Sequence, residues 1–226
     1  MISELEKTNK ELDRFIYSVS HDLSAPIKSI QGLINLTRME QLSKDSQHYL
    51  TLIEQSIKRQ NQFIAEIIEF GRNSRTQVQM EFVNIEKLIN NIIEDLKYSE
   101  HYSNTEINVH IAAEVKMIEC DKIRMKIILN NLLSNAIKFK SKYKERHLVS
   151  ITVFKTETGF GLTVEDNGIG IDSKHLDRLF TMFYRATDQQ PGSGIGLYIA
   201  FEAAKKMNLS LTVSSELGEG SVFTLK

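Results

Sequence analysis

In Asn130-Asn-Leu-Leu-Ser-Asn-Ala-Ile-Lys-Phe139, polar side chains interrupt an otherwise apolar helical pattern. Asn131, Asn135 and Lys138 recur at spacings of four and three, which places them on one face of the helix. Amide oxygens and an ammonium on an inward-facing stripe cost free energy unless a polar ligand meets them. A triphosphate with a bound divalent cation would satisfy them, and an exposed polar edge of the helix is the alternative.

Two glycine-rich segments follow this helix in the sequence. Asp166-Asn-Gly-Ile-Gly170 comes directly after an expected strand, so its glycines let the backbone approach a flat ligand and its carboxylate can accept a hydrogen bond from an exocyclic amine. Gly192-Ser-Gly-Ile-Gly-Leu197 opens a helix, whose free N–H groups favour phosphate. For either segment alone a tight turn is the simpler interpretation, and neither matches a dinucleotide fingerprint or a P-loop. Combined with the polar helix face, they predict a nucleotide pocket.

The hydrophobic periodicity of this part of the chain indicates an α+β domain, with helices on one face of a mixed sheet. We expect helices at 85–96, 121–139, 176–183 and 196–207, and strands at 106–111, 115–118, 147–154, 160–165, 209–213 and 221–225.

The rest of the 226-residue chain differs sharply in glycine content. Only Gly32 and Gly71 precede residue 159, whereas nine glycines lie between residues 159 and 220, which indicates two architectures in tandem. A hydrophobic content of 41% is enough for a sizeable core, and a net charge of −1 argues against a nucleic-acid partner. One cysteine, Cys120, excludes a disulfide framework.

Residues 1–75 predict a helical hairpin. Leu5, Leu12, Val19, Pro26 and Leu33 form one heptad series, and Ile2, Asn9, Ile16, Leu23, Ile30 and Thr37 form another, offset by three. After an interruption at 41–46, Leu50, Ile57 and Ile64 alternate with Ile53, Gln60 and Ile67 as far as Gly71, and residues 72–76 are expected to be a hinge. Further apolar residues widen this face beyond one stripe, so we expect a homodimer through residues 1–75, in which two hairpins form a four-helix bundle.

His21 falls at an outward-facing heptad position of the first helix, and Asp22 follows it directly. Pro26 removes the hydrogen bond to the Asp22 carbonyl and loosens that turn. A solvated surface histidine is the plain interpretation, and it also fits His48, His101, His110, His147 and His175, which lack metal-ligand spacing. The adjoining carboxylate and strained backbone make His21 a functional candidate.

Five motifs, in order, resemble those of the two-component sensor histidine kinases, in their dimerisation and phosphotransfer domain followed by an ATP-binding catalytic domain. The segment 18–26 resembles the H box, 131–139 the N box, 166–170 the first glycine box, 179–185 the F box and 192–197 the second glycine box. The resemblance covers essentially the whole chain. It implies a dimeric α-helical hairpin at 1–75 followed at 76–226 by an α+β two-layer sandwich of the Bergerat type, shared with gyrase-type ATPases.

The resemblance also implies residue roles. His21 would be the phosphoacceptor and Asp22 its acid/base partner. In the catalytic domain, Asn135 would coordinate Mg²⁺, and Asp166 would bind the adenine amino group of ATP. Phosphate contacts would come from Asn131, Lys138 and Arg185, the last to the γ-phosphate. Gly168 and Gly170 would leave room for the ring. The lid would be shaped by Gly192, Gly194, Gly196 and Leu197 and anchored by Phe180 and Phe183.

The implied activity is ATP-dependent autophosphorylation of His21 and transfer of the phosphoryl group to an aspartate of a response-regulator receiver domain. Alternatives are a catalytically weak ATP-binding dimeric scaffold that regulates a partner, and a gyrase- or chaperone-like ATPase, which the H box disfavours. The charged start of the chain and the absence of a long apolar run predict a cytoplasmic location. The heptads are already in register at the first residues, so we expect an upstream sensor segment, and the parent protein could be tethered to a membrane.

The chain departs from the family pattern at a few positions. Ser24-Ala25 stands where the family often has Arg followed by Thr or Asn. The Thr or Asn is tied to dephosphorylation of the partner, so Ala25 argues against phosphatase activity. Asn208-Leu209 replaces paired glycines, and the lid at 184–191 is short.

Overall fold

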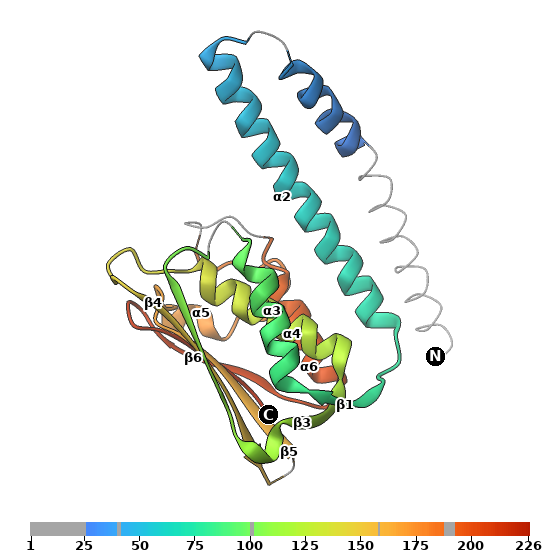
Figure 1. Cartoon of the computed structure of the whole chain (residues 1–226), viewed down its shortest axis with the longest axis vertical. Helices are drawn as coiled ribbons and strands as arrows, with labels where there is room; N and C mark the ends of the chain where they lie inside the picture. The colour runs from blue at the N-terminus through green and yellow to red at the C-terminus, as the bar shows by residue number, and fades with distance from the viewer. Residues whose placement is uncertain (1–25, 40–41, 100–101, 158, 188–192) are drawn as a thin grey trace. The chain divides into compact units, whose positions relative to one another are not determined.

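The computed structural model describes residues 26–39, 42–99, 102–157, 159–187 and 193–226 (Figure 1). Its contacts divide the chain into two compact units, Met1–Thr76 and Gln77–Lys226. Among the site residues predicted above, His21, Asp22 and Gly192 lie outside the described residues, as does Ala25.

The first unit contains a hairpin of two helices. Residues 26–37 are helical, and α2 spans Lys44–Arg75. Ser43 precedes α2, and its Oγ accepts a hydrogen bond from the Ser46 N–H at 3.2 Å, as expected of a helix N-cap. The helices pack through four buried isoleucines at seven-residue spacing, supported by Leu50 and Ile68: Ile27, Ile34, Ile57 and Ile64.

This packing corrects the predicted heptad assignment. Ile30 and Leu33, placed on the packed stripe of the first helix, are 44% and 63% exposed, and their neighbours Ile27 and Ile34 are buried instead. Leu50, Ile57 and Ile64 do pack as expected, whereas Ile53 is 44% exposed. The described part of the first helix therefore carries two apolar stripes. The stripe with Ile27 and Ile34 faces α2, whereas the stripe assigned to the heptads, with Ile30 and Leu33, does not.

The end of α2 also differs from the prediction. The helix passes through Gly71 without a break and ends at Arg75. One glycine costs about 1 kcal/mol in a helix, which a helix of 32 residues tolerates. The residues expected as a hinge, 72–76, are therefore helical except for Thr76.

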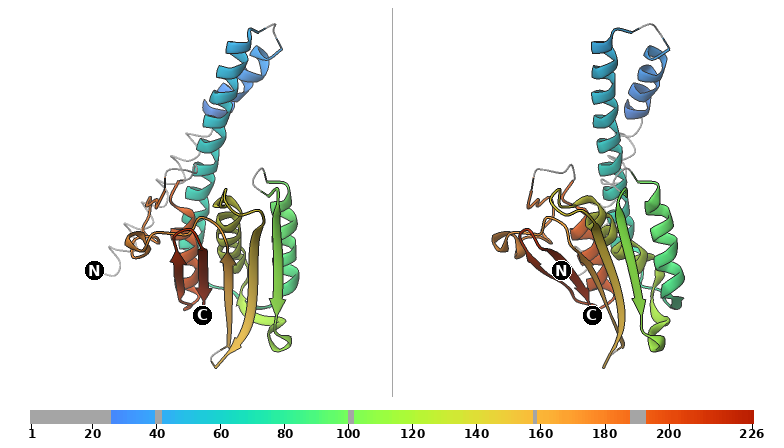
Figure 2. Two further views of the ribbon diagram at one scale, coloured as in Figure 1. Left: turned by 90° about the vertical axis from the view of Figure 1, so that its left-hand side faces the viewer. Right: turned by 60° about the vertical axis from the view of Figure 1, so that its left-hand side comes forward.

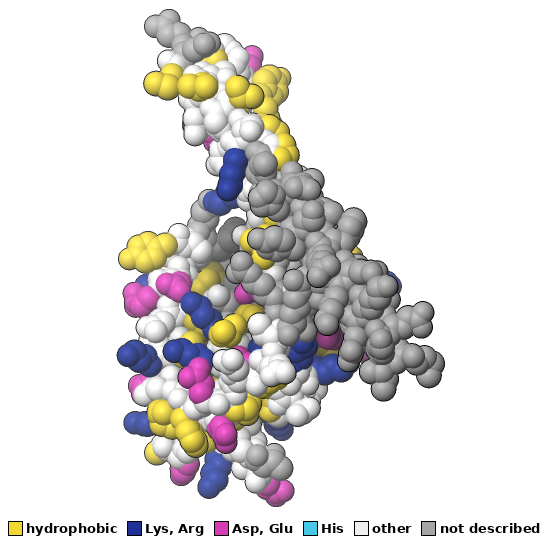
Figure 3. Space-filling model, turned by 90° about the vertical axis from the view of Figure 1, so that its right-hand side faces the viewer, with side chains coloured by type: hydrophobic (Ala, Val, Ile, Leu, Met, Phe, Trp, Pro, Cys, Tyr) yellow, Lys and Arg dark blue, Asp and Glu magenta, His cyan; other side chains and the backbone are white. Residues whose placement is uncertain are grey.

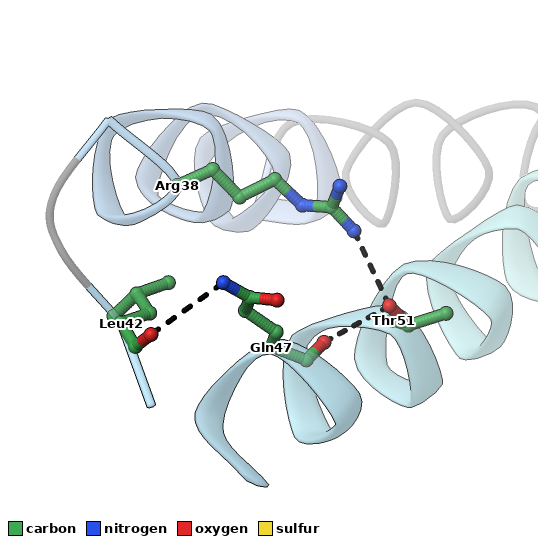
Figure 4. A pocket seen from close by; sticks show the side chains of 4 residues that line it. All are labelled: Arg38, Leu42, Gln47 and Thr51. Carbon is green, nitrogen blue, oxygen red and sulfur yellow. Dashed lines mark hydrogen bonds between the residues drawn. The ribbon is translucent and has the colours of Figure 1, made fainter. Parts of the chain in front are cut away.

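The turn end of the hairpin holds a shallow cavity of about 250 Å³, lined by Arg38, Leu42, Gln47 and Thr51 (Figure 4). Arg38 crosses between the helices, because its Nη2 donates to Glu54 Oε2 at 2.7 Å. None of the predicted nucleotide-binding residues lines this cavity. Its polar contacts instead hold the two ends of the turn together.

The second unit is an α+β sandwich. A five-stranded sheet has the order β2-β4-β5-β7-β6, in which only β2 and β4 are parallel. Its strands are β2 (Thr105–Ile111), β4 (His147–Thr156), β5 (Gly159–Asp166), β6 (Leu211–Glu216) and β7 (Gly220–Leu225). A separate antiparallel ribbon pairs β1 (Met80–Asn84) with β3 (Met117–Asp121). β1 was not expected from the sequence, and β3 starts two residues later than expected.

Helices α3 (Ile85–Lys97), α4 (Lys122–Lys138) and α6 (Gly196–Lys206) lie along one face of the five-stranded sheet (Figure 2). A short 3₁₀ helix, η1 (Ala113–Val115), joins β2 to β3. The central helix α4 buries nine residues, including Leu129, Leu132 and Leu133 at 0% exposure. Burying an aliphatic side chain stabilises the fold by about 1.5–3 kcal/mol, so α4 is the main apolar contributor. No helix among the described residues has both the length and the apolar character needed to cross a bilayer.

One predicted helix is wrong. Only Leu176 of this range is helical, as the last residue of the short helix α5 (Ser173–Leu176), and residues 177–183 form turns and a bend. Phe183 has a φ of +65°, which a helix does not allow. Its N–H donates to the Gly194 carbonyl at 3.0 Å, so a tertiary contact replaces the helical bond.

A buried ion pair anchors the start of the second unit. Asp121 caps α4 by accepting the Arg124 N–H at 3.0 Å, and the two side chains form a salt bridge at 5% and 2% exposure. Asp121 also accepts the Gln79 N–H at 3.0 Å, and Arg124 donates to the Gln77 carbonyl at 3.4 Å. The segment that follows α2 is therefore fixed to α4 from Gln77 onward.

Candidate nucleotide-binding site

Helix α4 touches both glycine-rich segments. Near its middle, the Asn131 Oδ1 would lie 2.5 Å from a Cβ placed on Gly196, the first residue of α6. At its C-terminal end, the Phe139 carbonyl accepts the Ile169 N–H at 3.0 Å and leaves no space for a Cβ at Gly168. The helix thus brings together segments that are far apart in the sequence.

The predicted polar face runs from the first of these contacts, made by Asn131, toward the second. Asn131, Asn135 and Lys138 are all half-buried, so none is on a fully exposed edge. Asn131 Nδ2 donates to the Ile127 carbonyl at 2.9 Å, which turns its Oδ1 toward α6. The Lys138 ammonium lies 5.2 Å from the centre of the Phe139 ring.

Asp166 ends β5 in a buried position, at 9% exposure. Its Oδ1 accepts the Gly168 N–H at 2.8 Å, which forms the tight turn. Burial raises the pKa of this carboxyl to about 6, and repulsion from Glu165 adds to the shift. The Gly168 and Ser221 N–H groups and the Lys144 ammonium act against it. A carboxyl so placed is ionised at neutral pH and has little water around it.

Two residues near Asp166 were missed from the sequence. The Lys144 Nζ donates to the Glu219 carbonyl at 2.7 Å in the β6–β7 turn, and its charge favours the ionised form of Asp166. Ser221 is buried, donates its N–H to Asp166 and has its Oγ 3.0 Å from that of Ser215. Neither carries a local sequence signal, because Ser221 reaches the site through the pairing of β5 with β7 and Lys144 through the loop between α4 and β4.

Two glycines of the site have backbone conformations that other residues rarely adopt. Gly170 has a φ of +65° and lies against the Glu216 carbonyl, and Gly194 has a φ of +74° and lies against Phe183 and Tyr184. Both positions also lack space for a side chain. Phe180 stacks on Phe201 of α6, with ring centres 5.2 Å apart, which ties the F-box segment to the second glycine segment.

Asn208, which stands where the family pattern has a glycine, has a local structural explanation. Asn208 follows α6 with a φ of +57°, the left-handed region where glycine is favoured and asparagine is the most tolerated alternative. Its N–H donates to the Lys205 carbonyl at 3.0 Å, and that of Leu209 to Ala204 at 3.0 Å. Asparagine therefore ends this helix as a glycine would.

Leu197 and Arg185 are the other predicted site residues that the structure describes. Leu197 is half-buried in the first turn of α6, and Arg185 lies on an exposed segment, where its Nη2 is 3.5 Å from the Thr187 carbonyl.

The prediction that His147 is a solvated surface histidine is wrong, because this residue is only 5% exposed. It belongs to the packing around α4.

The donor set fits a magnesium ion held mainly by phosphate. Within the described ranges, no group of three His, Cys, Asp or Glu side chains could hold a metal. Mg²⁺ usually takes one or two protein oxygens plus substrate phosphates and water. An amide oxygen such as that of Asn135 is a suitable single ligand for that arrangement.

Two family models match the chain. The His Kinase A (phospho-acceptor) domain matches residues 11–76, and the domain described as histidine kinase-, DNA gyrase B-, and HSP90-like ATPase matches residues 120–226. The order of the two is the order inferred from the motifs.

Curated relatives match the chain across both of these domains. The chain is 30% identical over 232 residues to the aerobic respiration control sensor protein ArcB of Escherichia coli, covering 98% of this chain and 29% of ArcB. It is 27% identical over 224 residues to the phytochrome-like protein Cph1 of Synechocystis sp., covering 97% of this chain and 29% of Cph1. The chain thus spans less than a third of the length of these relatives.

A solved structure shows the same fold. Full-length ShkA, crystallised in complex with AMPPNP, has a TM-score of 0.73 and 24% identity, over 93% of this chain and 44% of ShkA. The predicted fold class, a helical hairpin followed by a Bergerat-type α+β sandwich, is confirmed by these matches. With a phospho-acceptor domain followed by the ATPase domain, the chain belongs to the two-component sensor histidine kinases and contains their two-domain core.

Proposed function

We propose that the chain is an ATP-dependent protein histidine kinase that phosphorylates His21 and passes the phosphoryl group to an aspartate of a response regulator. The observation that carries the nucleotide half of this proposal is the double contact of α4, which sets Asn135 and Lys138 between the two glycine-rich segments. The phospho-acceptor family match at 11–76 supports the other half. We place the boundary between the phosphotransfer and catalytic domains at residues 75 and 76.

In this proposal the adenine and the phosphates of ATP bind different parts of the site. Asp166 accepts a hydrogen bond from the adenine amino group, next to Gly168 and Gly170. The phosphates lie along the polar face of α4, where Asn131 and Lys138 contact them, and the lid residues Gly192, Gly194, Gly196 and Leu197 cover them. Arg185 is a further candidate contact to the γ-phosphate.

Asn135 would hold Mg²⁺, which when bound neutralises charge on the phosphates and aligns them. Lys138 adds a positive charge on the same helix face. Phosphoryl transfer depends mainly on such positioning and charge neutralisation, so these side chains can supply what the reaction needs.

At the acceptor, the His21 imidazole attacks through a neutral nitrogen. An N–P bond forms as the bond from the γ-phosphorus to the bridging oxygen breaks, and ADP leaves with the electron pair. Asp22 takes the proton from the other ring nitrogen and orients the ring. The resulting phosphoramidate is labile enough to transfer its phosphoryl group to a carboxylate.

Incubation of the chain with γ-labelled ATP tests this function. We expect a label retained on the protein, stable to alkali and lost in acid. An ATP-binding scaffold would bind nucleotide and retain no label, and a gyrase-like ATPase would release phosphate without a labelled intermediate. Either result would contradict the kinase assignment.

The hairpin also supports the proposed homodimer. Its single-chain packing leaves a set of large apolar side chains exposed, between 44% and 84%: Ile30, Leu33, Leu36, Met39, Tyr49, Leu52 and Ile53. Figure 3 shows hydrophobic side chains gathered on the surface at the turn end of the hairpin. Because a patch of this kind marks an interface, we propose that a second copy covers it in a four-helix bundle.

Leu33→Glu should weaken this dimer about a hundredfold, because a carboxylate would have to be desolvated in an apolar interface. Light scattering across a dilution series measures the dimer fraction. Gln31→Glu introduces the same charge at another exposed position of the same helix and serves as the control. A dimer equally stable in both variants would place the interface elsewhere.

Nucleotide affinity should depend on pH through Asp166. If only the ionised carboxylate accepts the adenine amine, a pKa of about 6 predicts that the affinity for ATP falls about fourfold between pH 7.5 and pH 5.5. Calorimetric titrations at several pH values measure this. Glu165→Gln should move the midpoint to lower pH and Lys144→Gln to higher pH, because these charges raise and lower the pKa respectively.

The free energy of unfolding of the nucleotide-free protein should change in the opposite sense. The pKa of Asp166 is higher in the folded chain than its usual value, so the contribution of this group to stability is largest in acid and is lost as the pH rises through about 6. An affinity for ATP that rises on acidification would contradict the assignment of Asp166.

A further inference from the structure

His147 begins β4 with its ring buried against the end of α4. Its Nε2 lies 2.7 Å from the Ala136 carbonyl. A carbonyl oxygen can only accept a hydrogen bond, so Nε2 carries the hydrogen and donates it. Burial lowers the pKa of His147, and the positive charges of Lys140 and Lys144 act in the same direction, so the ring is neutral at physiological pH.

This bond supports a helix end that carries predicted phosphate-binding residues. The last carbonyls of a helix lack partners within the helix. In α4, the Phe139 N–H caps the Asn135 carbonyl at 3.0 Å, and the imidazole satisfies the next carbonyl along, that of Ala136. His147 thus contacts the turn between Asn135 and Lys138.

On its other side, His147 is held by the Asp166–Gly170 turn. The Asn167 Oδ1 accepts the N–H of the following residue, Leu148, at 2.8 Å, and its Nδ2 donates to the carbonyl of the preceding residue, Arg146, at 3.0 Å. The Asn167 N–H also donates to the Leu148 carbonyl at 3.2 Å. The residue next to Asp166 therefore fixes the backbone that carries the imidazole.

A second connection runs in parallel through the backbone alone. The Ile169 N–H donates to the Phe139 carbonyl at 3.0 Å. This bond fixes the position of the turn just beyond the helix but not the rotation of the last helical turn. The imidazole holds the Ala136 carbonyl, about one turn earlier in α4. Together the two bonds fix the orientation of the last helical turn, which the Phe139 bond alone does not.

We propose that His147 is a positioning residue for nucleotide binding, which fixes the polar face of α4 relative to the Asp166 turn. This inference rests on the proposed function and deepens it. The affinity for a ligand that spans the polar face and the Asp166 turn depends on the relative position of the two. Mg²⁺–ATP is such a ligand. Adenosine contacts only the Asp166 turn and does not sense the orientation of Asn135 and Lys138.

The test compares these two ligands by calorimetry in three variants. His147→Leu removes the donor, and we expect the affinity for Mg²⁺–ATP to fall about tenfold while that for adenosine stays within about twofold. His147→Gln places an amide N–H where Nε2 lies and should recover most of the ATP affinity. His110→Leu, the same change at an exposed position of β2, is the control and should change neither affinity.

Several outcomes would overturn the inference: unchanged ATP affinity in folded His147→Leu, an equal loss for both ligands, or no recovery with glutamine. If His147→Leu does not fold, Asn167→Ala removes the hydrogen bonds that hold the His147 backbone to the Asp166 turn. This variant should lose affinity for Mg²⁺–ATP and keep its affinity for adenosine; a loss of both affinities counts against the proposal. Failure of the wild-type chain to bind ATP would instead refute the proposed function itself, and this inference with it.

Discussion

His21→Gln is expected to abolish the acid-labile, alkali-stable label that γ-labelled ATP leaves on the wild-type chain. Glutamine keeps a side chain of similar reach and polarity, but its amide nitrogen has no basic lone pair to attack phosphorus. The expected effect is a complete loss, because His21 is the sole phosphoacceptor in the proposed reaction. The label is measured on denatured protein after acid and alkali treatment.

The control for this variant is His48→Gln, which makes the same change at an exposed histidine of α2 and should leave labelling unchanged. Nucleotide affinity should also be unchanged in His21→Gln, since the proposed ATP contacts all come from residues 131–197. A label that survives in His21→Gln would show that another residue is the acceptor.

The second large effect is expected for Asn135→Ala, which should weaken Mg²⁺–ATP binding at least about a hundredfold. The substitution removes the one protein oxygen proposed for the metal and leaves the buried side of α4 intact. Its signature is loss of magnesium dependence: affinities measured with Mg²⁺ and with a chelator should become equal. Isothermal titration calorimetry of both ligand forms measures this.

Asn90→Ala provides a matched control, because Asn90 is an exposed asparagine of a neighbouring helix, α3. It should bind Mg²⁺–ATP as the wild type does, and both variants should keep the wild-type melting temperature. If Asn135→Ala binds Mg²⁺–ATP normally, the metal and phosphates do not lie along the face of α4, and the proposed site is wrong.

Elements with strong local signals were predictable from the sequence. The helix expected at 121–139 is α4 at 122–138, and the strands expected at 147–154 and 160–165 are β4 and β5 with slightly longer bounds. Their hydrophobic periods extend over most of each element, so local preference and tertiary packing agree. The short helix expected at 176–183 failed because contacts with α6 and Tyr184 override a weak local preference.

The hairpin shows what periodicity leaves open. A heptad pattern reveals that apolar stripes exist, but it does not say which stripe faces which neighbour. The rotation of the first helix is decided by packing against α2, which buries Ile27 and Ile34 and leaves Ile30 and Leu33 exposed. If the proposed dimer forms, the stripe assigned from the heptads serves it instead.

The sequence by itself determined the class of the domains and the order of the motifs, and it supplied the side chains that we propose for nucleotide binding. These follow from residue type and spacing, which act over a few residues of chain. Only the tertiary structure decided that α4 touches both glycine segments, that Lys144 and Ser221 adjust the pKa of Asp166, and that the buried His147 ties the helix end to the turn. Burial and charge proximity arise from strand pairing and helix packing between distant segments, and no local pattern carries them.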